Sequence, residues 1–169
     1  MEKASIYTKR LVLRTLHDND RDDLLKILMN DSIKETYMIP HFPTVADAEP
    51  LLQRLTTLSS DSNRYVYGIS VHDRIIGFMH DVEIKDGKIE VGYVIHPQYQ
   101  NNGYATEALV ALIDHLHGCG FHTVTAGYFQ GNIASRRVME KAGMTKSAYE
   151  DDIEYRGKTH HCIYFESIR

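Results

Sequence analysis

Amides, glycine and histidine crowd into a short polar segment, residues 96–103, near the middle of the chain. It follows the β-branched and aromatic run Ile89 to Ile95, and from Tyr104 onward apolar residues recur at helical spacing. A helix start exposes unpaired N–H groups and a partial positive charge, which suit an anion. Gly103 allows a ligand to approach the main chain closely. The order of strand, glycine loop and helix therefore predicts a phosphate-binding site.

Two common glycine-loop patterns do not fit this segment. The sequence lacks G-x-x-x-x-G-K-[ST], so the lysine that a P-loop needs is missing. It also lacks a G-x-G-x-x-G that follows a first strand. These absences argue against a kinase and against a dinucleotide-binding enzyme.

The loop does carry the pattern Gln100-x-x-Gly103-x-Ala105, and a second block, NIASRRVMEKAGM, runs from Asn132 to Met144. The first pattern resembles the Q/R-x-x-G-x-G/A pyrophosphate loop of the GNAT superfamily of N-acetyltransferases. The second is similar to the signature of its branch that contains the ribosomal-protein N-terminal (alanine/serine) acetyltransferases. The opening IYTKRLVLRTLHDND also resembles the first strand of that branch. Acetyl-CoA-dependent transfer to an amine is the activity that this resemblance implies.

The resemblance covers nearly the whole chain and implies a single domain, residues 1–169. The expected fold class is α+β with three α/β/α layers: a mixed, mostly antiparallel sheet of about seven strands with helices on both faces. The length of 169 residues fits one domain. The pair Asp86-Gly87 is a strong hairpin signal between two strands.

Residue patterns place the elements of this fold along the chain. Asp18 or Asn19 is expected to cap the first helix, which buries Leu24, Leu25, Ile27 and Leu28. Further helices are expected over residues 44–58, 104–116 and 133–142. Strands are expected over residues 6–16, 65–71, 75–84, 89–95 and 123–129, followed by two closing strands around Arg156-Gly157-Lys158.

The resemblance also implies where acetyl-CoA binds. Its pantetheine arm would lie where two strands part at a bulge, close to Gly92, and Asn132 would contact the pantetheine amides. A main-chain N–H of Val94 or Ile95 would stabilise the developing oxyanion. The residues expected to bind the co-substrate are Val94, Ile95, His96, Gln100, Asn101, Asn102, Gly103, Tyr104, Ala105, Thr106, Asn132, Ser135 and Arg137.

Arg137 is the choice among three basic residues, the others being Arg136 and Lys141, for the adenosine phosphates. The alternative interpretation is that these basic side chains are simply solvated on the surface of the helix. Glu107, in the first turn of the preceding helix, is expected to support the helix dipole.

Transfer to an amine requires a proton acceptor, because an amine with a pKa of about 8 to 10 is mostly protonated at neutral pH. Glu90 is the first candidate, since the two-residue period of a strand places it on the same face as Gly92 and Val94. An exposed strand glutamate opposite a lysine is the alternative. Weaker candidates for the acceptor are His80, Glu83, His160 and His161.

The departing thiolate needs a proton donor. At the position where the resemblance leads one to expect a general-acid tyrosine, this chain has Met139, which cannot donate a proton. Ser135 is the nearest substitute and could hydrogen-bond the thiolate, while a helix cap is its alternative role. Cys119 and Cys162 are expected to be reduced thiols, and direct attack by the amine needs neither of them.

Several classes of partner are not expected. The net charge of −4 gives no basic field for nucleic acid. The longest apolar run, Ala108 to Ile113, is far shorter than the roughly 20 residues of a membrane span, and the N-terminus lacks a signal-peptide core. A cytoplasmic location is therefore predicted. The run His115-x-His117-x-Cys119 could suggest a metal, but residues i and i+2 of a helix point to different sides, so no metal is expected.

The acceptor is predicted to be a primary amine, with the α-amino group of a peptide or protein ahead of small molecules such as polyamines, amino acids or antibiotics. Tyr37, His41 and Phe42 are candidates to contact it, with a packed loop as the alternative. A non-catalytic acyl-CoA-binding module is the rival class, and Met139 gives it weight. A monomer or homodimer is expected.

Overall fold

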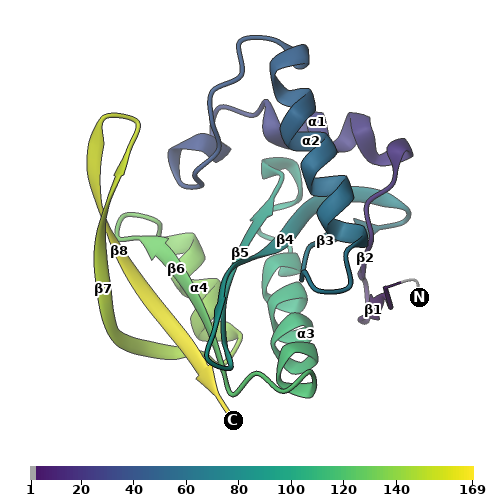
Figure 1. Ribbon diagram of the computed structural model, residues 1–169. Helices are drawn as coiled ribbons and strands as arrows, with labels where there is room; N and C mark the ends of the chain where they lie inside the picture. Colours follow the sequence, from purple (N-terminus) through teal and green to yellow (C-terminus); the bar gives the residue numbers. More distant parts are fainter. Residues whose placement is uncertain (1–2) are drawn as a thin grey trace.

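The computed structural model describes residues 3–169, and these form an eight-stranded sheet in the order β1-β2-β3-β4-β5-β6-β8-β7 (Figure 1). The strands are β1 Ile6–Tyr7, β2 Val12–Arg14, β3 Tyr67–Val71, β4 Arg74–Lys85, β5 Lys88–Ile95, β6 Thr123–Phe129, β7 Thr145–Tyr155 and β8 Lys158–Ile168. The α-helices are α1 Arg21–Leu28, α2 Val45–Ser60, α3 Tyr104–Gly118 and α4 Ile133–Lys141. Short 3-10 helices are η1 Asp18–Asp20, η2 Ile33–Glu35 and η3 Pro97–Tyr99.

Helices cover both faces of the sheet, and each face has its own buried cluster. The α3–α4 cluster joins Leu109 of α3 and Met139 of α4 to Val91 of β5. The α1–α2 cluster joins the apolar faces of α1 and α2 to Phe78 and Val94. Along β5, therefore, odd-numbered residues such as Val91 face one cluster and even-numbered residues such as Val94 face the other, as expected from the strand period. The predicted α+β class with helices on both faces is confirmed.

The N-terminal segment differs from the single strand predicted over residues 6–16. It forms two short antiparallel strands, β1 and β2, and these bring the sheet to eight strands instead of about seven. The turn between them is closed by two hydrogen bonds: the Thr8 N–H donates to the Leu11 carbonyl at 3.0 Å, and the Leu11 N–H donates to Thr8 Oγ1 at 2.8 Å. A hydroxyl that bonds to the backbone three residues away favours a turn over a continuous strand.

The first helix is not capped by Asp18 or Asn19. The short helix η1 precedes α1, and the Asp20 carboxylate accepts a hydrogen bond from the His17 N–H at 2.8 Å. Asp20 is buried and also pairs with Arg14 at 2.8 Å. This carboxylate therefore joins the helix start to β2. At α2 the predicted boundary is close, because Thr44 caps the helix together with Asp47.

The two central parallel strands, β5 and β6, are paired only at one end. Residues 88–90 of β5 pair with residues 123–125 of β6, and no further pairs form between the two strands beyond Glu90 within the described chain. The sheet thus opens from Val91 onward. A bulge was predicted near Gly92, where these two strands part, but the register shift lies in the neighbouring strand β4, between Asp81 and Glu83 opposite β5.

The two closing strands form a long antiparallel hairpin, coloured yellow-green to yellow in Figure 1, that extends beside the body of the molecule. Near its tip, the Tyr155 hydroxyl lies 2.8 Å from the carbonyl of Lys34 and 3.1 Å from the carbonyls of Tyr37 and Ile39. The hairpin therefore holds the loop over residues 33–39. Within residues 3–169, no helix is long and apolar enough to cross a membrane.

Candidate active site

A cavity of about 410 Å³ occupies the gap between the parting strands, within the size range of small-molecule sites. The sheet contributes β5 and β6, and the starts of α3 and α4 and the loop over residues 33–37 close the sides. The predicted co-substrate residues that line it are Val94, Ile95, Gln100, Asn101, Gly103, Tyr104, Ala105, Thr106, Asn132, Ser135 and Arg137. His96, Asn102 and Glu90 are not part of this lining.

The glycine loop has the backbone geometry that its sequence predicts. Gly103 precedes α3 with a φ of +77°, in the left-handed region that favours glycine. The first helical bond joins the Glu107 N–H to the Gly103 carbonyl at 3.0 Å. The N–H groups of residues 104–106 therefore have no helical partner and, with Tyr104, Ala105 and Thr106 lining the cavity, are available to an anion.

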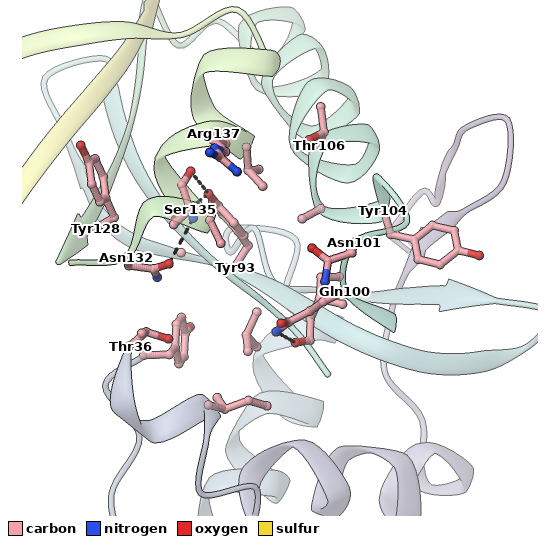
Figure 2. A pocket seen from close by; sticks show the side chains of 18 of the residues that line it. Thr36, Tyr93, Gln100, Asn101, Tyr104, Thr106, Tyr128, Asn132, Ser135 and Arg137 are labelled. Atoms are coloured by element: carbon pink, nitrogen blue, oxygen red, sulfur yellow. Dashed lines mark hydrogen bonds between the residues drawn. The ribbon is translucent and has the colours of Figure 1, made fainter. Parts of the chain in front are cut away.

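Two of the loop amides shape the loop itself. Gln100 Nε2 donates to the Ile95 carbonyl at 3.0 Å, and Asn102 Nδ2 lies 3.1 Å from the Tyr99 carbonyl and 3.0 Å from the Gln100 carbonyl. The Gln100 amide thus ties the loop to the end of β5, and the Asn102 amide bonds to carbonyls within the loop. Asn101 lines the cavity, with Gln100 beside it (Figure 2).

The N-terminal hairpin holds the loop from outside. The Glu107 carboxylate accepts hydrogen bonds from Thr8 Oγ1 at 2.7 Å, the Arg10 N–H at 2.8 Å and Arg10 Nε at 2.7 Å. Arg10 Nη1 also donates to the Asn102 carbonyl at 2.8 Å. Burial opposes ionisation of Glu107, but these hydrogen bonds outweigh it and lower the pKa of the carboxyl. Glu107 is therefore a structural anchor as well as a favourable charge at the helix start.

The start of α4 brings two hydroxyl groups together. Asn132 caps this helix, because its Oδ1 accepts the Ser135 N–H at 3.1 Å, so the cap is not Ser135. The Ser135 Oγ instead lies 2.9 Å from Tyr93 Oη of β5 (Figure 2). Burial raises the pKa of Tyr93 to about 12, so its hydroxyl stays protonated at neutral pH. Met139, at the position of the missing tyrosine, is fully buried in the α3–α4 cluster.

Two of the three basic residues of α4 line the cavity. Arg137 and Lys141 both belong to its wall, four residues apart on one side of the helix. Arg136 instead pairs with Glu140 at 2.8 Å, outside the wall. Arg137, the residue chosen from the sequence for the adenosine phosphates, therefore lines the cavity. Lys141, one turn further along the helix, lines it as well.

Main-chain donors of β5 also face the gap. The His96 N–H donates to the Ile76 carbonyl of β4 at 2.8 Å. Since alternate residues of a strand direct their N–H groups to opposite neighbours, those of Ile95 and Tyr93 point toward the open side. Of the two predicted oxyanion donors, the N–H of Ile95 is thus favourably oriented, while that of Val94 is directed to β4.

Glu90 lies on the same side of β5 as Gly92 and Val94, as predicted, and it pairs with Glu83 across the ladder. Burial and the neighbouring Glu83 carboxylate raise the pKa of Glu90. His160 stacks on Phe129 with ring centres 4.4 Å apart, and His161 contacts Glu150 and Asp152. The side chains of these predicted proton acceptors are absent from the lining of the cavity.

The cavity wall includes residues that sequence patterns did not assign to a site. Tyr128 belongs to the α3–α4 cluster and Tyr93 packs against it, and Thr36 lies in an irregular loop (Figure 2). Of the candidates to contact the acceptor, Tyr37 lines the cavity, whereas Phe42 is buried in the α1–α2 cluster. Tyr37 contacts His80, which is 43 residues away, and no local pattern could have shown that contact.

A central sheet that parts beside a glycine-capped helix start forms a site that suits an extended ligand with a phosphate group. The sequence matches the Acetyltransferase (GNAT) domain over residues 10–145, and the chain belongs to this family of N-acetyltransferases. Use of acetyl-CoA is general in the family.

Individual relatives agree with this assignment. The chain is 27% identical over 158 residues to the uncharacterised N-acetyltransferase YoaA of Bacillus subtilis, covering 90% of this chain and 89% of that protein. The fold is similar to that of RimL, a ribosomal L7/L12 α-N-protein acetyltransferase, in complex with coenzyme A, with a TM-score of 0.85, 18% identity and 98% of each chain covered. An acetyltransferase from Salmonella typhimurium that modifies the N-terminal serine of L7/L12 has a TM-score of 0.83 at 18% identity, covering 98% of this chain and 99% of that one.

Proposed function

We propose that this protein transfers the acetyl group of acetyl-CoA directly to a primary amine, with both substrates bound together. The observation that carries the proposal is the cavity between β5 and β6. It joins a glycine-capped helix start at one side to a partly buried pair of hydroxyls at the start of α4. A site that holds both substrates in position can promote this reaction without a covalent enzyme intermediate.

The cavity fits the parts of acetyl-CoA in order. The N–H groups at the start of α3 and the Gly103 backbone suit a pyrophosphate, and Arg137 and Lys141 supply positive charge for a further phosphate. The unpaired inner edge of β5, beyond Glu90, offers main-chain groups to the pantetheine amides, with Asn132 across the gap. When bound, the co-substrate supplies an activated acetyl thioester.

Residues of this chain would then assist the transfer. The Ile95 N–H faces the gap and would donate to the carbonyl oxygen as negative charge develops on it. The Ser135 hydroxyl would donate to the departing thiolate, while Tyr93 donates to Ser135 Oγ. Because Tyr93 remains protonated at neutral pH, it holds the serine hydroxyl in a donating orientation.

Two groups could accept the proton that the amine loses. Glu90, predicted from the sequence, lies on the correct face of β5, and its raised pKa would bring it closer to the working pH of a general base. It would need a water molecule to reach the cavity, because it does not line it. The second candidate is a tyrosine and histidine pair beside Gly92.

We propose the α-amino group of a peptide or protein as the acceptor, ahead of a small-molecule amine. The support is the activity of two structural neighbours, which acetylate the N-terminus of a ribosomal protein. The N-terminus of a peptide would have to reach the cavity from the protein surface, and the loop over residues 33–37 borders the cavity. Mass spectrometry of a peptide library and of small amines after incubation with acetyl-CoA would decide between the two acceptor classes.

Thiol release from acetyl-CoA in the presence of amines tests the reaction itself. An acetyltransferase releases free CoA only when an acceptor is present, whereas a non-catalytic module binds acetyl-CoA and releases none. Calorimetry of CoA binding to Gly103→Asp tests the site. The new side chain would begin 3.3 Å from Arg10 Nη2, in a strained backbone position, and would add a negative charge at the helix start, so we expect the affinity to fall at least tenfold.

Two further variants control this experiment. Asn tolerates a positive φ and carries no charge, so Gly103→Asn is expected to lose less affinity than Gly103→Asp. Gly118, at the far end of α3, has open space around it, so Gly118→Asp should bind CoA like the wild type. Equal affinity of Gly103→Asp and wild type would remove the loop from the site.

A further inference from the structure

Tyr37 and His80 form a hydrogen-bonded pair at the edge of the cavity. Tyr37 Oη is hydrogen-bonded to His80 Nε2, and the two rings meet edge to face with centres 5.9 Å apart. Tyr37 also packs against Phe78 of the α1–α2 cluster, with ring centres 6.1 Å apart. The loop over residues 33–39 and strand β4 therefore hold one member of the pair each, and only the Tyr37 side chain reaches the cavity wall.

The hydrogen bonds of His80 define its tautomer. His80 Nδ1 lies 3.1 Å from the Asp81 carbonyl oxygen, which can only accept a hydrogen bond. Nδ1 therefore carries the proton, and in the neutral ring Nε2 is left as an acceptor. Tyr37 must then donate its hydroxyl hydrogen to Nε2. The result is a chain of two hydrogen bonds that begins at the cavity wall and ends at a strand carbonyl.

The pair occupies the position where β5 has no side chain. A Cβ atom added to Gly92 would lie 2.7 Å from His80 Nε2 and 3.4 Å from Tyr37 Oη. Any other residue at this position would push into the histidine ring. Gly92 also lines the cavity, next to Tyr93 and Val94, where the sheet has opened. The absence of a side chain thus brings the pair close to the main chain that faces the acetyl group.

This inference rests on the proposed function, and it names the proton acceptor of that reaction. We infer that the Tyr37–His80 pair receives the amine proton, with Tyr37 Oη as the group that faces the substrate and His80 as the base behind it. As the C–N bond forms and the C–S bond breaks, the nitrogen passes one proton to Tyr37 Oη, whose own hydrogen moves to His80 Nε2. The sulfur leaves as a thiolate that the Ser135 hydroxyl hydrogen-bonds without losing its own proton. The proton held by His80 then passes to solvent, and solvent protonates the thiolate, so charge and protons balance.

The surroundings of His80 keep it in the form that a base needs. Burial lowers the pKa of His80 below its ordinary value, so the ring is neutral at neutral pH. Asp81 and Arg64 are the charged groups near it; the carboxylate of Asp81 opposes this shift and Arg64 supports it. Those two side chains are paired with each other at 2.7 Å. Burial also raises the pKa of Tyr37, so its hydroxyl remains protonated and can relay a proton.

Geometry favours this pair over Glu90. Tyr37 lines the cavity, whereas Glu90 lies outside the lining and faces the like charge of Glu83. A proton released in the cavity thus meets a hydroxyl that already donates to a neutral base. Reaching Glu90 would require an added water molecule.

Single-turnover kinetics of Tyr37→Phe and His80→Gln test the inference. Because general base catalysis contributes about 10²-fold or more, we expect each variant to slow acetyl transfer by about that factor with CoA affinity unchanged. The double variant should be no slower than the slower single variant, since either change breaks the same relay. Tyr7→Phe, on an exposed side chain of β1, is the matched control and should keep the wild-type rate.

A pH profile separates this role from a structural one. With a weakly basic amine as acceptor, the wild-type rate should rise with pH through an ionisation below pH 6.5, the ordinary histidine pKa. That limb should stay in place when the acceptor amine is changed, and it should disappear in His80→Gln. The inference would be overturned if Tyr37→Phe and His80→Gln both kept the wild-type rate and its rise with pH. It would also be overturned if Glu90→Gln were the one variant that lost this rise. An inactive wild type with every amine would instead refute the proposed function.

Discussion

Ser135 Oγ and Tyr93 Oη lie 2.9 Å apart, although 42 residues separate them in the chain. The pair bridges the start of α4 and the open part of β5, at the place where the leaving thiolate is proposed to depart. A tyrosine is thus present near this position after all, on a strand and not on the helix where Met139 replaces it. Tyr93 would act through the serine, as a positioning residue.

Removal of the Tyr93 hydroxyl should slow the chemical step more than it weakens binding. Tyr93→Phe leaves Ser135 Oγ without its donor, and the loss of a hydrogen bond worth about 1 kcal/mol corresponds to a rate reduction of roughly 5-fold to 10-fold. Single-turnover rates and CoA calorimetry on Tyr93→Phe, Ser135→Ala and the double variant provide the measurement. Fully additive losses would show that the two hydroxyls act independently.

The anchor at Glu107 should make stability depend on pH. Its pKa is lower in the folded state, so its contribution is fully present above the unfolded pKa of about 4.3 and is lost as the pH falls through the folded value. We therefore expect the Tm of the wild type to decrease on acidification over about pH 5 to 3 more steeply than that of Glu107→Gln. Calorimetric melting across this range measures the difference. Glu35→Gln, at an exposed carboxylate, should keep the wild-type slope.

Gly92→Ala should lower both the stability and the activity of the protein, because the new side chain would collide with His80. The added methyl group would lie 2.7 Å from the histidine ring, so we expect both lower stability and slower transfer. Combining Gly92→Ala with His80→Ala removes the clash, and the free energy of unfolding should recover while the rate should not. Denaturant unfolding and single-turnover assays of the two single variants and the double variant test this. Recovery of activity in the double variant would contradict a catalytic part for His80.

Tyr155→Phe should loosen the loop that carries Tyr37. The hydroxyl of Tyr155 lies within hydrogen-bond distance of three carbonyls of that loop, those of Lys34, Tyr37 and Ile39. Without it, we expect faster amide hydrogen exchange over residues 33–39 and a higher KM for the amine, with unchanged CoA affinity. Exchange that remains at the wild-type rate would mean that packing alone holds the loop.

Local sequence signals predicted much of the fold. Gly103, the polar loop and the helical spacing after Tyr104 are all contained in one short stretch, so the position of the glycine loop and of the start of α3 could be predicted. The hairpin at Asp86-Gly87 was equally local, and both residues have positive φ values. These features depend on backbone preferences of a few adjacent residues.

Contacts between distant segments could not be predicted in this way. The pairing of Tyr37 with His80 and of Glu107 with Arg10 depends on how loops pack against the finished sheet. The role of Ser135 depended on register, because Asn132 three residues earlier could also cap the helix and does so. Gln100 and Asn102 were expected to bind the co-substrate, yet the amide nitrogens of both bond to nearby backbone carbonyls.

The division of the interior by the sheet has a consequence for how such an enzyme can diversify. The α3–α4 cluster supports the phosphate loop and the start of α4, while the α1–α2 cluster supports the loop that carries Tyr37. Substitutions in α1 and α2, whose residues lie outside the cavity wall, can therefore change the amine that is accepted while the contacts with the acetyl donor are kept, since effects at well-separated sites are nearly additive. A lineage of such proteins could adopt new acceptors by drift on one face while the opposite face stays under selection for the donor.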